Sequence, residues 1–309
     1  GRKTNMNIAD GVWPVMITPF TEDNRIDYDS VLKIIDWYAR MGVAGIFAVC
    51  QSSEMFWLTL KERLELTKFV VDNTPKHMGV IASGHVADDL ETQIDEARAS
   101  IDTGIQAYVF VSNRFARENE NEEAAKRSIE RLIESVDSDS FGIYECPYPY
   151  KRLMSPGLLK WCAETGKFAF LKDTCCNVDQ LRAKCEAAAG TELKIFNANA
   201  ATLLESLKLG CAGYSGVMAN FHPDLYVWLC ANYQKEPQKA GVVQDALGSA
   251  SLIECQAYPV NAKYHMRLEG IDMRISSRVM SEERMTQSRR MEVEQFRRNM
   301  ERMRNYVNQ

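Results

Sequence analysis

The chain has 309 residues, of which 46% are hydrophobic and 26% are charged, and its formal net charge is −5. These values are typical of a soluble globular protein, exclude bulk disorder, and give no basic footprint for nucleic acid or an anionic membrane. The nine cysteines and four histidines show neither a disulfide framework nor zinc-ligand spacing. No apolar run is long enough to span a bilayer and no signal-peptide pattern opens the chain, so we expect a cytoplasmic protein.

After the polar residues 1–7, which we expect to be disordered, short apolar runs alternate with longer amphipathic stretches as far as Tyr233. The alternation predicts helices between successive strands, among them 30–41, 60–72, 88–103, 124–136 and 200–209. The predicted strands are Val12–Thr18, Val43–Val49, His77–Ser83, Ile105–Ser112, Phe141–Tyr144, Phe168–Lys172, Leu193–Asn197 and Cys211–Gly216.

Eight strand-then-helix units in roughly 220 residues match the size of a closed (β/α)₈ TIM barrel of the α/β class. An open doubly wound sheet is the alternative, but it usually carries a glycine-rich turn after its first strand. The first predicted strand is followed instead by Pro19-Phe20-Thr21-Glu22. We therefore predict a (β/α)₈ barrel over residues 8–233.

From Pro237 onward the pattern is helical throughout and ends in the Arg-, Glu- and Met-rich stretch Ser281–Tyr306. This predicts a C-terminal helical subdomain, residues 234–309, that packs on the barrel. Acidic residues are interleaved with the arginines of the last stretch, which indicates a solvated helix face and not a nucleic-acid surface.

Catalytic groups of such barrels lie at the carboxyl ends of the strands. The second strand ends in the segment Cys50–Glu54, whose short hydroxyls and backbone N–H groups could cradle a carboxylate. The fifth strand ends in Tyr144, and the sixth places Lys172 after the apolar run Phe168–Leu171. Desolvation there would lower the pKa of the lysine and leave free amine near neutral pH, as a Schiff-base nucleophile requires.

Each of these groups has a structural alternative. Lys172 could extend from the strand end and pair with Asp173, and Tyr144 could be a core tyrosine with a satisfied hydroxyl. The segment Gln51–Ser53 could be only a loop and helix cap. The functional interpretation is favoured because hydroxyls, a phenol and an amine coincide at the ends of strands two, five and six.

The order of several motifs from Val12 to about Asn232 resembles the dihydrodipicolinate synthase/N-acetylneuraminate lyase family of class I aldolases. The matching segments are Gly11–Phe20, Gly42–Glu54, Phe141–Pro147, Leu171–Thr174, and Gly213–Asn220 followed by Pro223. The third segment resembles the family's Tyr-Asn-x-Pro strand, and the fourth resembles the strand that carries its Schiff-base lysine.

The resemblance implies a lyase that forms a Schiff base between Lys172 and pyruvate or another 2-keto acid. It implies that Tyr144 shuttles protons, and that the substrate is bound around Gln51, Ser52, Ser53 and, on the eighth strand, Ser215. It also implies a homodimer or homotetramer that needs no metal or organic cofactor, because an iminium is itself an electron sink.

Three departures from the family pattern concern the proton relay and the second substrate. Gln51 stands where the family has a threonine or serine that relays protons, and Ser112-Asn113-Arg114-Phe115 replaces its Pro-Tyr-Tyr. The arginine that follows Tyr-Asn-x-Pro in the family has no clean counterpart. We therefore predict aldol cleavage or condensation, or dehydration, with a partner other than aspartate semialdehyde. The alternatives are a true dihydrodipicolinate synthase (4-hydroxy-tetrahydrodipicolinate synthase) with an altered site and a non-catalytic keto-acid-binding protein.

Three cations, Arg114, Lys151 and Arg152, follow strands four and five. If they replace the missing tyrosine and arginine, the second substrate should be acidic or polyhydroxylated, with Arg114 binding a carboxylate bidentately. The alternative is that all three are solvated loop cations.

Overall fold

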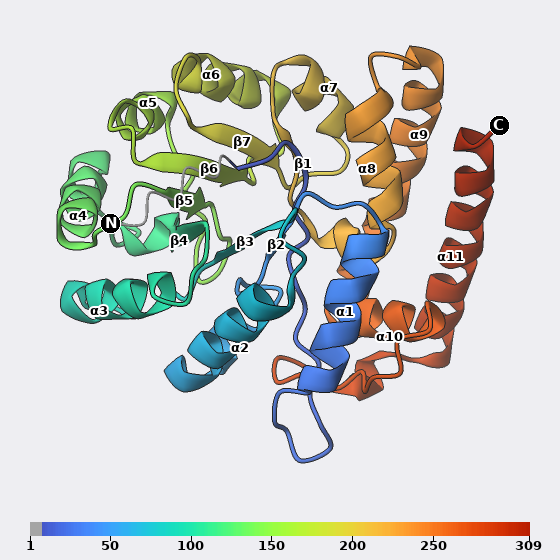
Figure 1. Ribbon diagram of the computed structural model, residues 1–309. Helices are drawn as coiled ribbons and strands as arrows, with labels where there is room; N and C mark the ends of the chain where they lie inside the picture. The colour runs from blue at the N-terminus through green and yellow to red at the C-terminus, as the bar shows by residue number, and fades with distance from the viewer. Residues whose placement is uncertain (1–7) are drawn as a thin grey trace.

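Eight parallel strands form one sheet in the order β1-β8-β7-β6-β5-β4-β3-β2 in a computed structural model that describes residues 8–309 (Figure 1). A parallel bridge between Val15, which follows the first strand, and Phe47 of the second strand closes the barrel, which confirms the predicted fold. The segment 1–7, where we predicted disorder, lies outside the described residues. The strands are β1 Gly11–Val12, β2 Gly45–Phe47, β3 Gly79–Ala82, β4 Ala107–Val111, β5 Phe141–Tyr144, β6 Phe168–Asp173, β7 Lys194–Asn197 and β8 Gly213–Tyr214.

Helices surround the barrel because each buries one apolar stripe against the strands. In α1 the buried stripe includes Val31, Ile34 and Tyr38, and the carboxylate of Asp27 caps the helix by accepting from the Ser30 N–H. The helices of the barrel are α1 Tyr28–Arg40, α2 Leu60–Asn73, α3 Leu90–Ile101, α4 Glu122–Ser135, α5 Pro156–Glu164, α6 Val178–Ala188, α7 Leu203–Lys208 and α8 Pro223–Asn232.

Strand β1 is much shorter than the predicted range Val12–Thr18. Pro14 has no N–H to donate to a ladder, so regular pairing with β8 stops before it. The chain then runs along β2, where the Phe47 N–H donates to the Pro14 carbonyl at 2.9 Å and the Met16 N–H donates to the Phe47 carbonyl at 3.0 Å.

Four aromatic side chains fill the barrel interior: Trp13, Phe47, Phe170 and Phe196 are all fully buried. The rings of Phe170 and Phe196 stack with centroids 4.6 Å apart, and Trp13 lies edge-on to both. Glycine at position 45 makes room for this layer, because a Cβ there would lie 2.2 Å from the Trp13 ring. These four side chains form a buried layer beneath the carboxyl end of the barrel, which we call the aromatic floor.

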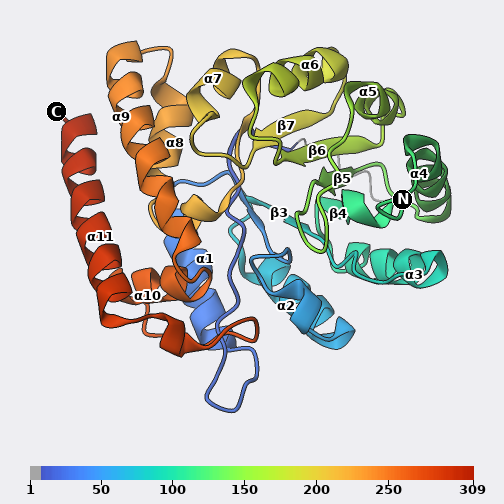
Figure 2. The same ribbon diagram turned by 180° about the vertical axis from the view of Figure 1, so that it is seen from behind.

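The C-terminal helices α9 Pro237–Ala250, α10 Val260–Leu268 and α11 Gln287–Val307 cover the side of the barrel near α1 and α8 (Figure 2). The prediction of helix throughout this region is wrong for residues 271–281, which are not helical. Backbone N–H groups of Arg278 and Val279 donate to the buried carboxylate of Glu54, which a continuous helix would not permit. Helix α11 begins at Gln287 and not at Ser281, because Thr286 caps it.

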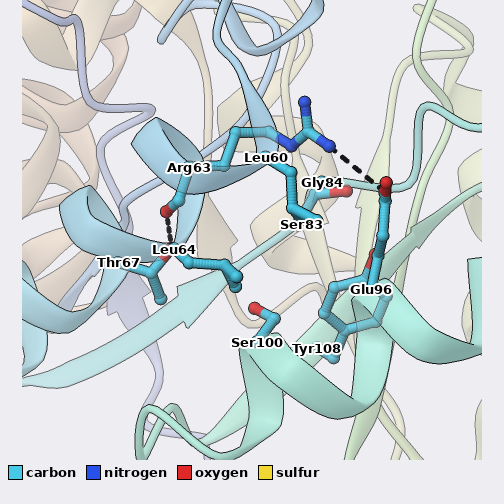
Figure 3. A pocket seen from close by; sticks show the side chains of 9 residues that line it. All are labelled: Leu60, Arg63, Leu64, Thr67, Ser83, Gly84, Glu96, Ser100 and Tyr108. Carbon is cyan, nitrogen blue, oxygen red and sulfur yellow. Dashed lines mark hydrogen bonds and ion pairs between the residues drawn. The ribbon is translucent and has the colours of Figure 1, made fainter.

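A very small cavity lies between α2, α3 and β4 (Figure 3). Arg63 pairs there with Glu96 at 3.2 Å, while the hydroxyls of Ser100 and Tyr108 have no hydrogen-bond partner within residues 8–309. Its volume of about 10 Å³ accommodates one water molecule and no organic substrate. Across the same described residues, every helix is too short or too polar to cross a membrane.

Candidate active site

A cavity of about 510 Å³ opens at the carboxyl ends of the strands. Its wall combines the ends of strands β2, β5, β6 and β7 with residues from the C-terminal region. The residues that line it are Gln51, Ser52, Glu54, Trp57, Tyr144, Pro147, Tyr148, Lys151, Lys172, Thr174, Cys176, Ala198, Asn199, Val217, Glu254, Tyr258, Pro259 and Val279.

Lys172 and Tyr144 lie side by side because β5 and β6 pair in a register that sets them directly opposite each other. In a parallel pair, opposite residues point to the same face of the sheet, so both side chains enter the cavity. The Nζ atom of Lys172 lies 5.1 Å from the centre of the Tyr144 ring. The sequence prediction that these two groups share one site is consistent with this geometry.

The Lys172 amine is buried and makes one polar contact within residues 8–309, a hydrogen bond of 2.6 Å to the Ser215 carbonyl. It does not pair with Asp173, the alternative suggested by the sequence, because Lys184 binds that carboxylate. Burial lowers the pKa of Lys172 to about 8, while nearby thiols and carboxylates oppose the shift. About a tenth of the lysine is therefore free amine at pH 7.

Burial also raises the pKa of the Tyr144 phenol well above its usual value of 10, so the hydroxyl keeps its proton. That hydroxyl donates to the side-chain oxygen of Gln51 over a long distance of 3.4 Å. An amide oxygen accepts a hydrogen bond but does not pass a proton onward as a hydroxyl can. Gln51 therefore orients Tyr144 without extending a proton relay.

The loop after β2 offers three polar groups to a ligand. The backbone N–H groups of Gln51 and Ser52 have no partner within residues 8–309, whereas the next two N–H groups close turns of the loop. The Ser52 hydroxyl accepts a hydrogen bond of 2.7 Å from Tyr258 and keeps its own proton free to donate. Two N–H donors and one O–H donor next to Lys172 can bind a carboxylate.

Two of the predicted substrate-binding residues do not reach the cavity. The Ser53 hydroxyl is fully buried beneath the loop, where it donates to the Met16 carbonyl and accepts from the Cys50 N–H. The Ser215 hydroxyl donates to the Trp13 carbonyl at 2.8 Å. Ser53 shapes the loop, and Ser215 holds Lys172 through its carbonyl, so neither hydroxyl is free for substrate.

The predicted rim cations are also distributed differently. Arg114 does not line the cavity but pairs with Asp88 at 3.0 Å, and Arg152 donates to the carbonyls of Arg117 and Glu120. Each arginine therefore binds a neighbouring loop and is not directed into the cavity. Lys151 does line the cavity, where its Nζ donates to the Thr174 carbonyl at 2.8 Å.

Two polar cavity residues from the C-terminal region, Tyr258 and Glu254, were not identified by the sequence analysis. Tyr258 accepts a hydrogen bond of 3.1 Å from the Asn220 amide and donates to Ser52, so it fixes the Ser52 hydroxyl. Neither residue follows a strand, so the rule that strand ends carry the chemistry could not find them. The sequence before Pro259 indicates a loop, but it does not show against which part of the barrel that loop packs.

A buried ion cluster lies directly behind Tyr144 and Lys172. The Nζ of Lys184 lies 2.7 Å from both the Glu145 and the Asp173 carboxylates, and all three side chains are at most 1% exposed. Burial alone would lower the pKa of Lys184, but the two carboxylates raise it. The cluster ties α6 to the strand residues that follow Tyr144 and Lys172. Helical periodicity could have revealed it, because Lys184 falls on the apolar stripe of α6 with Leu181 and Ala188.

A second buried pair connects the substrate loop to the C-terminal region. Glu54 lies 2.8 Å from Lys263 and accepts further hydrogen bonds from the Ser277 hydroxyl and the Arg278 N–H. Its own backbone is left-handed, with φ of 66°. The loop bearing Gln51 and Ser52 is thus anchored to residues more than two hundred positions away.

The Dihydrodipicolinate synthetase family model matches residues 9–295. The 4-hydroxy-tetrahydrodipicolinate synthase of Cellvibrio japonicus is 25% identical over 254 residues, which cover 81% of this chain and 86% of that protein. The fold resembles that of a dihydrodipicolinate synthase from Bacillus anthracis, with a TM-score of 0.86 and 19% identity over 95% of this chain and 99% of the other. It also resembles a prophage protein of the dihydrodipicolinic acid synthase family from E. coli K12, solved in complex with pyruvate, with a TM-score of 0.83 and 20% identity over 96% and 98%. Because the family model spans most of its length, the chain is a class I aldolase-type lyase of the dihydrodipicolinate synthetase family.

Proposed function

We propose that the enzyme binds pyruvate or a closely related 2-keto acid as a Schiff base on Lys172. The observation that carries this proposal is the Lys172 amine, buried on an aromatic floor beside Tyr144, with its pKa lowered to about 8. Two related structures solved in complex with pyruvate, from E. coli K12 and Acinetobacter baumannii, support the choice of keto acid.

The free amine attacks C2 of the keto acid, and the nitrogen loses one proton while the former carbonyl oxygen gains one, which gives a neutral carbinolamine. A second proton converts that hydroxyl to water, which leaves as the C=N bond of the iminium forms. Loss of a proton from C3 then gives the enamine, whose electron pair is held by the former iminium. The Tyr144 ring lies 5.1 Å from the Lys172 Nζ in the same cavity, and we assign its hydroxyl these proton transfers.

The keto-acid carboxylate is bound by the loop after β2. The free N–H groups of Gln51 and Ser52 and the Ser52 hydroxyl donate to it, and Tyr258 holds that hydroxyl in place. The enamine C3 then forms a C–C bond to an aldehyde carbon, whose oxygen takes a proton, and water releases the product from Lys172. In the reverse direction the same groups cleave that bond. This chemistry uses no metal and no organic cofactor, and we expect the enzyme to act as a homo-oligomer.

Borohydride trapping of pyruvate, timed at several pH values, tests the proposed function. Reduction of the iminium should add the pyruvate carbon skeleton irreversibly to the protein mass. Because the neutral amine is the nucleophile, the initial labelling rate should rise about tenfold from pH 6 to pH 7 and level off above the Lys172 pKa of about 8. A protein that gains no mass at pH 8 would refute the Schiff base.

Replacing Tyr144 by Phe should lower kcat for pyruvate-dependent turnover by about 10²-fold or more, which is the usual contribution of a positioned acid–base group. The change removes one hydroxyl whose hydrogen bond to Gln51 is long, so the variant should fold normally. Steady-state kinetics and circular dichroism measure the two effects. Unchanged kcat would show that Tyr144 only lines the cavity.

A further inference from the structure

The cavity contains a carboxylate that the Schiff-base steps do not use. Glu254 lies in the short 3₁₀ turn Ser251–Cys255 and lines the same cavity as Lys172. Within residues 8–309 its carboxylate forms neither a hydrogen bond nor an ion pair, although the side chain is largely buried. Burial raises its pKa, and the positive charge of Lys172 opposes the shift.

Within residues 8–309 the half-buried carboxylate of Glu254 has no protein donor, so a ligand hydroxyl that donates to it can take the place of solvent. The other carboxylate in the wall, Glu54, is satisfied by Lys263, Ser277 and Arg278. The two carboxylates therefore differ in their hydrogen bonding: protein groups donate to Glu54, whereas within residues 8–309 none donates to Glu254, which can accept from a ligand.

An amide donor lines the cavity as well. The side-chain oxygen of Asn199 accepts from the N–H and hydroxyl of Thr202, at 3.1 and 2.9 Å, while its amide nitrogen has no partner within residues 8–309. An alcohol can accept a hydrogen bond from such an amide and donate one to a carboxylate such as Glu254.

The cations expected to bind an acidic second substrate are elsewhere. Arg114 is paired with Asp88, and Arg152 is bound to loop carbonyls. The remaining cation, Lys151, is exposed and already donates to the Thr174 carbonyl, so solvent screens much of its charge. An aldehyde that carries a carboxylate would therefore enter a cavity whose wall contains the Glu254 carboxylate and no arginine.

We propose that Glu254 selects the second substrate: it accepts hydrogen bonds from the hydroxyls of an uncharged, hydroxylated aldehyde and repels aldehydes that carry a carboxylate. This inference rests on the proposed function, because the aldehyde reacts with the enamine on Lys172. The sequence suggested a second substrate that is acidic or polyhydroxylated. The role proposed for Glu254 favours the polyhydroxylated substrate over the acidic one.

The test compares the parent enzyme with Glu254→Gln on matched aldehydes, with pyruvate as the donor. The probes are glyceraldehyde and erythrose as hydroxylated aldehydes, succinic semialdehyde as an anion, and propanal as an apolar control. Glu254→Gln should lower kcat/KM for the hydroxylated aldehydes about tenfold and raise it for succinic semialdehyde by a similar factor. The propanal value should change little, because propanal has neither a donor nor a charge. Glu192→Gln is the matched control, since Glu192 is exposed and precedes β7 at the opposite end of the barrel.

Several results would overturn the assignment. One is an equal change for all four aldehydes in Glu254→Gln, which would mean that the carboxylate acts on Lys172 and not on the aldehyde. Another is a parent enzyme that uses succinic semialdehyde or aspartate semialdehyde better than either hydroxylated aldehyde, or that traps pyruvate and uses neither of them. Pyruvate trapping separates the two proposals: a parent that traps pyruvate but fails these comparisons refutes only the role of Glu254, whereas a parent that traps none refutes both.

Discussion

Replacement of Lys172 by Met should abolish borohydride-trappable mass and lower pyruvate-dependent kcat by about 10⁴-fold or more, as expected when a covalent nucleophile is lost. Met has a similar length and no charge, and it fits the apolar surroundings of a side chain that is 4% exposed. The variant should therefore fold, with only the Ser215 carbonyl losing its donor. Intact-protein mass spectrometry after reduction, together with steady-state kinetics, measures both effects.

Lys151→Met is the control for this experiment, because Lys151 lines the same cavity but is exposed. The Lys151 side chain is exposed and its Nζ donates to the Thr174 carbonyl, whereas the Nζ of Lys172 is buried beside the Tyr144 ring. Trapping should persist in Lys151→Met and disappear in Lys172→Met. Loss of labelling in Lys151→Met alone would transfer the Schiff base to that residue.

Replacement of Lys184 by Met should destabilise the protein by about 3–5 kcal/mol, the usual cost of leaving a buried charge without its partner. The Glu145 and Asp173 carboxylates, both 0% exposed, would face each other without a cation. Urea denaturation at pH 7, monitored by tryptophan fluorescence, gives the change in unfolding free energy. Lys208→Met removes an exposed pair with Glu205 and should cost no more than about 1 kcal/mol.

The double variant Lys184→Met/Glu145→Gln distinguishes lost charge balance from lost packing. Removing one carboxylate relieves the repulsion, so the double variant should be more stable than Lys184→Met alone. If Glu145→Gln instead adds its full cost to that of Lys184→Met, the cluster contributes through shape and not through charge.

The barrel could be predicted because short apolar, β-branched runs alternate with amphipathic stretches along the sequence. Lys172 and Tyr144 could be located because they end strands, and strand ends converge in a closed parallel barrel. Ser53 and Ser215 were predicted to bind substrate, but their hydroxyls form hydrogen bonds with backbone groups. The sequence does not show which hydroxyls are engaged in this way. Arg114 was misplaced for a similar reason, since its partner Asp88 follows a different strand.

The contributions of the C-terminal region could not be predicted from strand ends. Tyr258 and Glu254 approach the cavity from a segment that follows the last strand by some forty positions. Their placement depends on how the C-terminal helices pack on the barrel, and periodicity describes a helix without saying where it docks. The cavity takes residues from both sides of the predicted division into 8–233 and 234–309.

The Glu54 anchor has a consequence for the order in which the site matures during synthesis. A ribosome releases residues from the N-terminus onward, so all eight strands leave the exit tunnel before Lys263 and Ser277, the partners of Glu54, have emerged. Until then the Glu54 carboxylate has no cation, and the Ser52 hydroxyl has not met Tyr258. A nascent barrel would thus contain Lys172 before the loop that binds the keto-acid carboxylate is held in place. We expect it to react with a keto acid only after the last quarter of the chain has packed on the barrel.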